Sequence, residues 1–309
     1  MLCMNFSFFE GEYMYDILNT KKLCENIYSM VVKAPRVSRH CLPGQFVIVR
    51  SDENSERIPL TICDYSRENE TITLVFQVIG ASTMNLAMLK SGETLHDIAG
   101  PLGKESELCN TDLDTLKAKN ILFVAGGLGV APVYPQVKWL NDNNIGCDVI
   151  VGAKTKDLVI YEDEMRKVCT NLYITTDDGS YGEKGLVTDM VENLVNNHSK
   201  NYDLCIAIGP MIMMKFMCLT TKKLGIPTIV SLNPIMVDGT GMCGACRVTV
   251  DGKVRFACVD GPEFDGHKVD FDEAMKRQQM YKSSEGRAYL KEKEGDTHHG
   301  GCGYCGGEQ

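Results

Sequence analysis

Two cysteines and a nearby carboxylate in one glycine-rich loop are the residues of this 309-residue chain best placed to bind a metal. In VDGTGMCGACRV, residues 237–248, Cys243 and Cys246 form a C-x2-C pair. Asp238 lies five positions before Cys243, where a plant-type 2Fe-2S loop of the form C-x4-C-x2-C has its first cysteine. The spacing therefore indicates a cluster with one oxygen ligand, a zinc site, or a cluster loop that has lost a ligand.

A third thiol is expected to return to this loop through a hairpin. Cys246 and Cys258 are separated by RVTVDGKVRFA, in which two strand-like runs flank Asp251-Gly252, a dipeptide that favours tight hairpin turns. Three thiols and Asp238 are thus the predicted ligands of a 2Fe-2S cluster. The alternatives are a structural zinc ion bound by the three cysteines and one other ligand, or a loop in which Asp238 is only a turn residue.

As a metal ligand, Asp238 would supply the same negative charge as a thiolate but would form a less covalent bond to the metal. A carboxylate with an unperturbed pKa of about 3.9 is ionised at neutral pH and supplies one negative charge. Oxygen is a harder and less covalent donor than sulfur, so it should alter the reduction potential of a cluster.

The middle of the chain alternates buried strands with helices. The expected strands are 120–127, 147–154, 172–179 and 202–210, and the expected helices are 130–143, 162–169, 185–197 and 211–225. This alternation predicts a parallel sheet wound on both sides, with ligands at the carboxyl ends of its strands.

Two glycine turns at that edge are typical of a dinucleotide site. AGGLGVAP places Gly126, Gly127 and Gly129 between a strand and a helix, and Gly209-Pro210 follows the last strand. Backbone N–H groups in such turns can meet phosphate, although tight strand-to-helix turns are the alternative. Asp177 follows the third strand, where a carboxylate can bind ribose hydroxyls and favour NADH over NADPH; an acidic turn is equally consistent.

The first third of the chain reads as short strands separated by Pro, Gly and charged turns, which predicts a small antiparallel barrel or sandwich. Arg57 in ERIPLT suits a flavin pyrophosphate. Gly80, Ser82 and Thr83 at a helix start suit phosphate through backbone and hydroxyl donors. A surface arginine and ordinary helix-cap residues are the alternatives.

Composition excludes some partners. A net charge of −9 argues against nucleic acid, and no apolar run approaches the roughly 18–20 residues of a membrane span. Most of the 14 cysteines are scattered singly, which predicts reduced thiols in a cytoplasmic protein. The tail with His298, His299, Cys302 and Cys305 could bind a metal, but a disordered or partner-contacting tail is favoured.

Taken together, the order of barrel, nucleotide domain and cysteine loop resembles the ferredoxin-reductase family, and within it the electron-transfer subunits grouped with dihydroorotate dehydrogenase. The resemblance covers residues 15–265, and MVDGTGMCGACRVTV and FACVDGPEFDGHKVDF are its most specific segments. It implies a leader (1–13), an antiparallel β-barrel FAD domain (14–112), an α/β parallel-sheet NAD domain (113–226), a small C-terminal 2Fe-2S domain (227–268), and a helical and disordered tail (269–309).

The resemblance also implies roles for individual residues. Arg57, Pro59, Leu60 and Thr61 fall on the flavin-binding strand end, with Thr61 orienting flavin N5, and Gly80, Ser82 and Thr83 fall on the FAD phosphate turn. Gly126, Gly127 and Gly129 fall on the NAD(H) loop, with Gly209 and Pro210 on the second turn. The broader family pattern places the arginine three residues before the Ser or Thr, whereas Arg57 lies four before Thr61, and Leu60 replaces an aromatic residue.

The implied activity is electron transfer between NAD(H), FAD and a 2Fe-2S cluster, with a larger flavin and iron–sulfur subunit as partner, through which ferredoxin and NADPH act. Asp238 stands where dihydroorotate-type subunits have a cysteine. Small subunits of the NADH-dependent ferredoxin:NADP oxidoreductase type share the aspartate, which favours that branch over the dihydroorotate dehydrogenase branch of pyrimidine biosynthesis. A zinc-stabilised, nucleotide-binding interaction subunit without catalysis is a hypothesis from another class.

Overall fold

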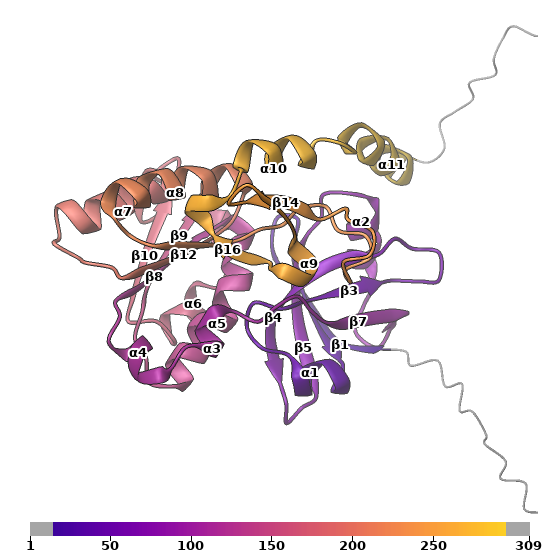
Figure 1. Cartoon of the computed structure of the whole chain (residues 1–309). Helices are drawn as coiled ribbons and strands as arrows, with labels where there is room; N and C mark the ends of the chain where they lie inside the picture. Colours follow the sequence, from indigo (N-terminus) through magenta and orange to yellow (C-terminus); the bar gives the residue numbers. More distant parts are fainter. Residues whose placement is uncertain (1–14, 295–309) are drawn as a thin grey trace, which may run out of the picture.

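The computed structural model describes residues 15–294. The expected leader and the His298–Cys305 segment lie outside the described residues. Two seven-stranded sheets and one short hairpin make up the β structure, and Figure 1 shows the first sheet in indigo beside the helix-covered second sheet.

The first sheet is antiparallel throughout and forms a nearly closed barrel, as the sequence predicts. Its strand order is β6-β1-β2-β5-β4-β3-β7. The strands are β1 (Tyr15–Cys24), β2 (Ile27–Lys33), β3 (Phe46–Arg50), β4 (Ile58–Ser66), β5 (Thr71–Gln77), β6 (Thr94–Leu95) and β7 (Asp97–Leu102), with helices α1 (Pro35–His40) and α2 (Ala81–Met88) between them. Alternate residues of each strand fill the barrel, so that Leu60 and Ile62 of β4 pack with Val47 and Val49 of β3.

The second sheet is parallel except at one edge. Its order is β11-β10-β9-β8-β12-β13-β16, and only β16 runs antiparallel to its neighbour. The strands are β8 (Ile121–Gly126), β9 (Asp148–Ala153), β10 (Asn171–Thr176), β11 (Glu183–Lys184), β12 (Leu204–Ile208), β13 (Thr228–Ser231) and β16 (Glu263–Asp265). Because the chain runs from β8 toward β10 and then back to β12 beside β8, the order reverses between β8 and β12.

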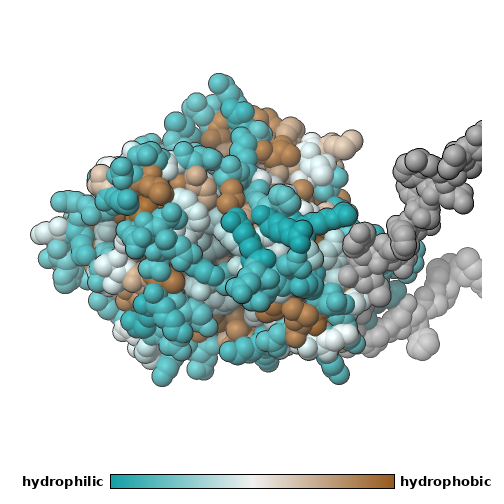
Figure 2. Space-filling view, turned by 90° about the horizontal axis from the view of Figure 1, so that it is seen from below, coloured by the Kyte–Doolittle hydropathy of each residue, from teal (hydrophilic) through white to brown (hydrophobic). Residues whose placement is uncertain are grey.

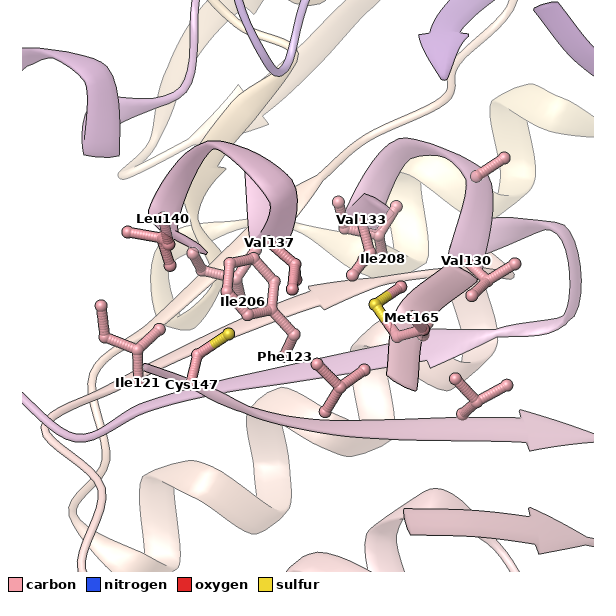
Figure 3. Packing of buried hydrophobic residues seen from close by; sticks show 14 of the residues in the cluster. Ile121, Phe123, Val130, Val133, Val137, Leu140, Cys147, Met165, Ile206 and Ile208 are labelled. Atoms are coloured by element: carbon pink, nitrogen blue, oxygen red, sulfur yellow. The ribbon is translucent and has the colours of Figure 1, made fainter. Parts of the chain in front are cut away.

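Helices cover both faces of this sheet. Short helices α3 (Glu107–Asn110) and α4 (Leu113–Lys117) lead into it from the barrel. One face packs against α5 (Val130–Asp142) and α6 (Glu162–Arg166), and the other against α7 (Val187–Asn196), α8 (Met211–Leu224) and α10 (Phe271–Gln278). Figure 3 shows Val133, Val137 and Leu140 of α5, spaced at helical intervals, packed over Phe123 and Ile206 of the sheet.

The cysteine loop is anchored to the second sheet at both ends. The chain leaves β13, crosses to the barrel, and forms the hairpin β14 (Arg247–Val250) and β15 (Lys253–Phe256) before α9 (Ala257–Asp260) and β16. Asp251 and Gly252 have φ values of +53° and +69°, as a two-residue primed turn requires, so the predicted hairpin is confirmed. Residues 227–268 therefore contribute two strands to the nucleotide sheet as well as the loop.

Two helices follow β16. Helix α10 packs against α8 and β14, and α11 (Lys282–Glu294) lies against α2 of the barrel. Arg277 of α10 donates a hydrogen bond to the carbonyl oxygen of Ala245 at 3.1 Å. Helix α10 therefore supports the back of the cysteine loop.

The face of the molecule seen in Figure 2 is mainly hydrophilic. Within residues 15–294, no helix combines the length and apolar character that spanning a bilayer would need. On the face in Figure 2, small hydrophobic areas are separated by hydrophilic side chains.

A buried carboxylate joins the three parts of the molecule. Glu263 of β16 accepts hydrogen bonds from Ser106, in the segment after the barrel, at 2.9 Å and from Gln136 of α5 at 2.7 Å. Ser106 and Gln136 are themselves at most 1% exposed. Burial is the main reason that the pKa of Glu263 rises to about 7, although Ser106 and Gln136 favour the anion.

We predict that ionisation of Glu263 makes the folded protein less stable as the pH rises. A carboxyl whose pKa is higher in the folded than in the unfolded chain stabilises the fold below its ordinary pKa of 4.5, and this contribution is lost as the pH rises through about 7. Glu263→Gln keeps both hydrogen-bond partners without ionising. The free energy of unfolding of the wild type relative to this variant should fall by about 3 kcal/mol between about pH 5 and about pH 8.

Chemical denaturation followed by circular dichroism at a series of pH values measures this difference. Glu192→Gln, on the exposed side of α7, is the matched control and should keep the pH dependence of the wild type. Parallel stability curves for the wild type and Glu263→Gln would contradict the prediction.

Candidate functional site

Two of the three predicted cluster cysteines are buried and touch each other. Cys246 and Cys258 are each 2% exposed, and their Sγ atoms lie 3.2 Å apart. They pack against Phe46 and Ile48 of the barrel strand β3. Cys243 is exposed, so the loop presents one thiol to solvent and two toward the barrel.

Backbone N–H groups point toward the sulfur atoms. The N–H of Cys258 lies 3.5 Å from Cys246 Sγ, and a hydrogen bond from the Ala245 backbone lowers the pKa of the Cys243 thiol. Burial raises the pKa of Cys258 to about 12, against a smaller lowering by the Gly241 backbone. Cys258 is therefore protonated at neutral pH unless a cation such as iron replaces its proton.

The Asp238 carboxylate organises the loop. Its Oδ2 accepts hydrogen bonds from the Thr240 N–H at 3.0 Å and the Met242 N–H at 3.4 Å, and from the Thr240 hydroxyl. The two donors of Thr240 are the main cause that holds the pKa of Asp238 below its usual value. Sequence reasoning missed Thr240, although an Asp-Gly-Thr segment is a typical Asx-turn signal.

The predicted ligands are Asp238 and three thiols, of which those of Cys246 and Cys258 touch. Throughout residues 15–294, no three His, Cys, Asp or Glu side chains are gathered about one point in the way that would hold a metal ion. Structural zinc needs four donors about one point, whereas a 2Fe-2S cluster shares its ligands between two irons. The glycines of the loop are also demanded by its fit, since a Cβ on Gly239 (φ +82°) would lie 2.4 Å from Ile48 Cδ1.

The outer face of β4 adjoins this loop. Because side chains alternate along a strand, Pro59 and Thr61 face outward while Leu60 is buried in the barrel core. The Leu60 side chain is therefore not available as the predicted flavin contact, and only its backbone reaches this face. Thr61 pairs in register with Phe46, which packs against the cluster cysteines.

The residues predicted for the flavin phosphates gather at the start of α2. Thr83 Oγ1 accepts hydrogen bonds from the N–H groups of Ile79 and Gly80, each at 3.1 Å, and Ser82 donates to the Glu56 carboxylate. No atom lies within 4 Å of the position that a Cβ on Gly80 would take. The approach to this helix end is therefore open, as a phosphate would need.

Arg57 lies elsewhere. Its Nε donates to the carbonyl oxygen of Val237 at 3.3 Å and its Nη2 to that of Asp238 at 3.4 Å. The side chain thus reaches the cysteine loop, whereas the neighbouring Glu56 accepts the hydrogen bond from Ser82 at the start of α2.

The two glycine turns of the second sheet meet at the switch between β8 and β12. A Cβ on Gly129 would lie 2.1 Å from the carbonyl oxygen of Ile208, and one on Gly209 would lie 3.2 Å from Gly126 Cα. Backbone packing therefore requires Gly129, while Gly126 and Gly209 leave room chiefly for the Met213 side chain of α8. Gly127 (φ +55°) has no atom within 4 Å of its Cβ position, so it leaves space at the carboxyl edge where doubly wound sheets bind ligands. Pro210 is the N-cap residue of α8.

The two aspartates after β10 differ in role. Asp178 Oδ1 accepts hydrogen bonds from Ser180 N at 2.9 Å and Ser180 Oγ at 2.6 Å, and these bonds lower the pKa of Asp178. Asp178 is therefore a turn residue. Asp177 is exposed at the same edge of the sheet as the glycine turns.

Known proteins share this arrangement. Residues 123–219 match the oxidoreductase NAD-binding domain, and residues 233–270 match the iron–sulfur cluster binding domain of dihydroorotate dehydrogenase B. A Thermotoga maritima protein described as a homologue of the dihydroorotate dehydrogenase B (NAD(+)) electron transfer subunit is 44% identical over 279 residues, covering 90% of this chain and 95% of its own. This chain belongs to the dihydroorotate dehydrogenase B electron-transfer subunit family.

This chain is similar over nearly its whole length to a solved chain of the NADH-dependent reduced ferredoxin-NADP oxidoreductase. That structure was described in connection with flavin-based electron bifurcation. It is 43% identical with a TM-score of 0.83, covering 91% of this chain and 99% of its own. An uncharacterised protein in the adh 3′ region of Clostridium beijerinckii is 59% identical over 297 residues, covering 96% of this chain and 100% of its own. This chain is thus an oxidoreductase subunit with a ferredoxin-reductase-like fold and an electron-transfer role.

We predict that Gly129→Ala destabilises the nucleotide domain. The new methyl group would overlap the Ile208 carbonyl oxygen, and forcing the two turns apart should cost about 3 kcal/mol of unfolding free energy. Chemical denaturation measures the loss. Gly286→Ala in α11, where no atom lies within 4 Å of the new methyl, should leave stability unchanged or slightly raised. If Gly129→Ala were as stable as the wild type, Gly129 could not lie as close to the Ile208 carbonyl group as the structure places it.

Proposed function

We propose that this chain is the small, electron-transferring subunit of an NADH-dependent ferredoxin:NADP oxidoreductase. The observation that carries the proposal is the shared packing of the outer face of β3 and β4. Phe46 and Ile48 of this face contact the two buried cluster cysteines, while Cys63 at its far end packs in the core formed by α5 and the nucleotide sheet. Thr61 lies between these two contacts.

The nucleotide edge would bind NAD(H). The open position at Gly127 and the N-terminus of α5 offer backbone N–H groups to phosphate, and exposed Asp177 can accept hydrogen bonds from ribose hydroxyls. A carboxylate there would repel a 2′-phosphate, which favours NADH. Gly126, Gly129, Gly209 and Pro210 shape this edge by packing the two turns together.

The barrel would bind FAD. Gly80, Ser82 and Thr83 at the start of α2 would hold the phosphates, with Ser82 exchanging Glu56 for phosphate oxygen. Pro59 and Thr61 would lie under the flavin ring, with the Thr61 hydroxyl as the donor toward N5, and Leu60 would support the ring through its backbone. No side chain is needed to move a proton during hydride transfer.

The cysteine loop would hold a 2Fe-2S cluster through Asp238, Cys243, Cys246 and Cys258. Bound FAD would supply a hydride acceptor for NADH, and a cluster held by these four residues would supply a one-electron carrier. The chain keeps the cysteine pair in a dry apolar contact with the barrel and leaves Cys243 at the surface. The surface side of the loop is therefore where a larger flavin and iron–sulfur subunit would collect electrons.

The ferredoxin:NADP branch is favoured by the 43% identity to the solved chain and by Asp238 in place of a first cysteine. The alternative is the electron-transfer subunit of dihydroorotate dehydrogenase, which the family relatives support. Anaerobic purification of the native complex decides between them. We expect a partner that couples NADPH and ferredoxin to NAD(H), whereas a partner that oxidises dihydroorotate would overturn the branch assignment.

We predict that Asp238→Ala loses most of its iron and that Asp238→Cys retains it. Alanine removes the ligand oxygen and the acceptor for Thr240 together, whereas cysteine restores a single negative donor. Thr240→Ala is the control, because it removes a hydrogen-bond partner of the Asp238 carboxylate and leaves the carboxylate in place. If Asp238 acts as an iron ligand, this variant should keep most of the iron. Iron content, visible absorption and electron paramagnetic resonance measure the outcome. An unchanged cluster spectrum in Asp238→Ala would show that Asp238 is only a turn residue.

A further inference from the structure

Arg57 joins the flavin strand to the cysteine loop across 180 residues of sequence. It immediately precedes β4, and its side chain lies on the outer side with Pro59 and Thr61, because residues two and four apart share a strand face. Ile58 points the other way and packs against the barrel core. The chain therefore carries its arginine on the side that faces the loop.

The guanidinium contacts two consecutive carbonyl groups. Nε donates to Val237 O and Nη2 donates to Asp238 O, which uses the planar fork of arginine in a way that a lysine could not reproduce. On its other side, Nη1 lies 4.0 Å from the Asp97 carboxylate of β7. The group is thus held between the barrel wall and the loop segment that contains the proposed oxygen ligand.

The loop at this point has little freedom to move. Gly239 follows Asp238 directly and leaves no room for a Cβ against Ile48 and Leu102 of the barrel. Arg57 binds the carbonyl groups of Val237 and Asp238, just before this glycine, so a hydrogen-bonding side chain and an apolar contact act together on this part of the loop.

We propose that Arg57 is a positioning residue of the cluster loop, which it fixes against the flavin-bearing strand, and that it does not bind the flavin pyrophosphate. The proposal rests on the proposed function in taking FAD and a cluster as the bound groups. Arg57 also places a positive charge beside the loop. Since reduction adds a negative charge to a cluster, loss of this cation should lower the reduction potential.

Arg57→Gln and Arg57→Lys test the proposal in the full-length, anaerobically purified protein. In Arg57→Gln we expect FAD content equal to wild type, iron release to a chelator faster by about tenfold, and a more negative cluster midpoint potential. Backbone hydrogen exchange over residues 237–246 should also be faster. Arg57→Lys should keep a potential near that of the wild type, because the charge remains, but should show faster exchange, because the fork is lost.

Arg67→Gln, an arginine that stacks on Tyr65 of β4, is the matched control and should leave all four measurements unchanged. Loss of FAD from Arg57→Gln with wild-type iron release and exchange would overturn the proposal in favour of a pyrophosphate ligand. Wild-type values in every measurement would overturn it as well. A wild-type protein without flavin or iron would refute the proposed function instead, and hydrogen exchange in that protein would still test the contact between Arg57 and the loop.

Discussion

The outer face of strands β3 and β4 carries apolar side chains that must be shielded from water. Two different elements cover it, and the rest of the molecule is arranged around these two contacts. At one end the face is covered by the cysteine loop through Phe46 and Ile48. At the other end it is covered by α5, through Cys63 in the apolar core and an ion pair of 2.7 Å between Lys138 and Asp64. Thr61 lies between these covers, so a ring bound there would have the nucleotide edge on one side and the cluster loop on the other.

This arrangement requires a loop whose position is fixed, because electron transfer depends on distance. The loop begins at β13 and returns to β16, and both strands belong to the nucleotide sheet. Helix α10 supports it from behind through Arg277, Arg57 ties it to the barrel, and Glu263 fastens its root to Ser106 and Gln136. The loop thus gains a defined place from contacts with the barrel and α10 and from the anchoring of its root to Ser106 and α5.

Much of this could be predicted from local sequence. The alternating strands and helices after residue 120 specify a parallel sheet. The Asp251-Gly252 turn specifies the hairpin that brings Cys258 back to Cys246, whereas Cys243, predicted to meet them, is exposed. These signals are local, since period, turn chemistry and spacing act within a few residues.

The remainder depends on contacts between distant segments. Nothing near Glu263 in the sequence indicates that it is buried against Ser106 and Gln136, and the direction of Arg57 follows from strand parity together with a loop 180 residues away. The glycines of the nucleotide edge were predicted as phosphate contacts, but Gly129 is already required by the packing of one turn on the other, and Gly126 and Gly209 lie against the Met213 side chain. Leu60 was predicted in the flavin site together with its neighbours in sequence, whereas strand alternation sends its side chain into the core.

The central claim is that one chain brings NADH, flavin and cluster into electronic contact through the outer face of β4. Anaerobic titration of the isolated full-length chain with NADH, followed by visible absorption and electron paramagnetic resonance, tests it most directly. We expect NADH to bleach the flavin and the signal of a reduced 2Fe-2S cluster to develop in the same protein. The contrary result would be that NADH reduces the flavin but the cluster stays oxidised. It would count if a chemical reductant then reduced the cluster and the cluster's midpoint potential lay within the range that NADH can reach.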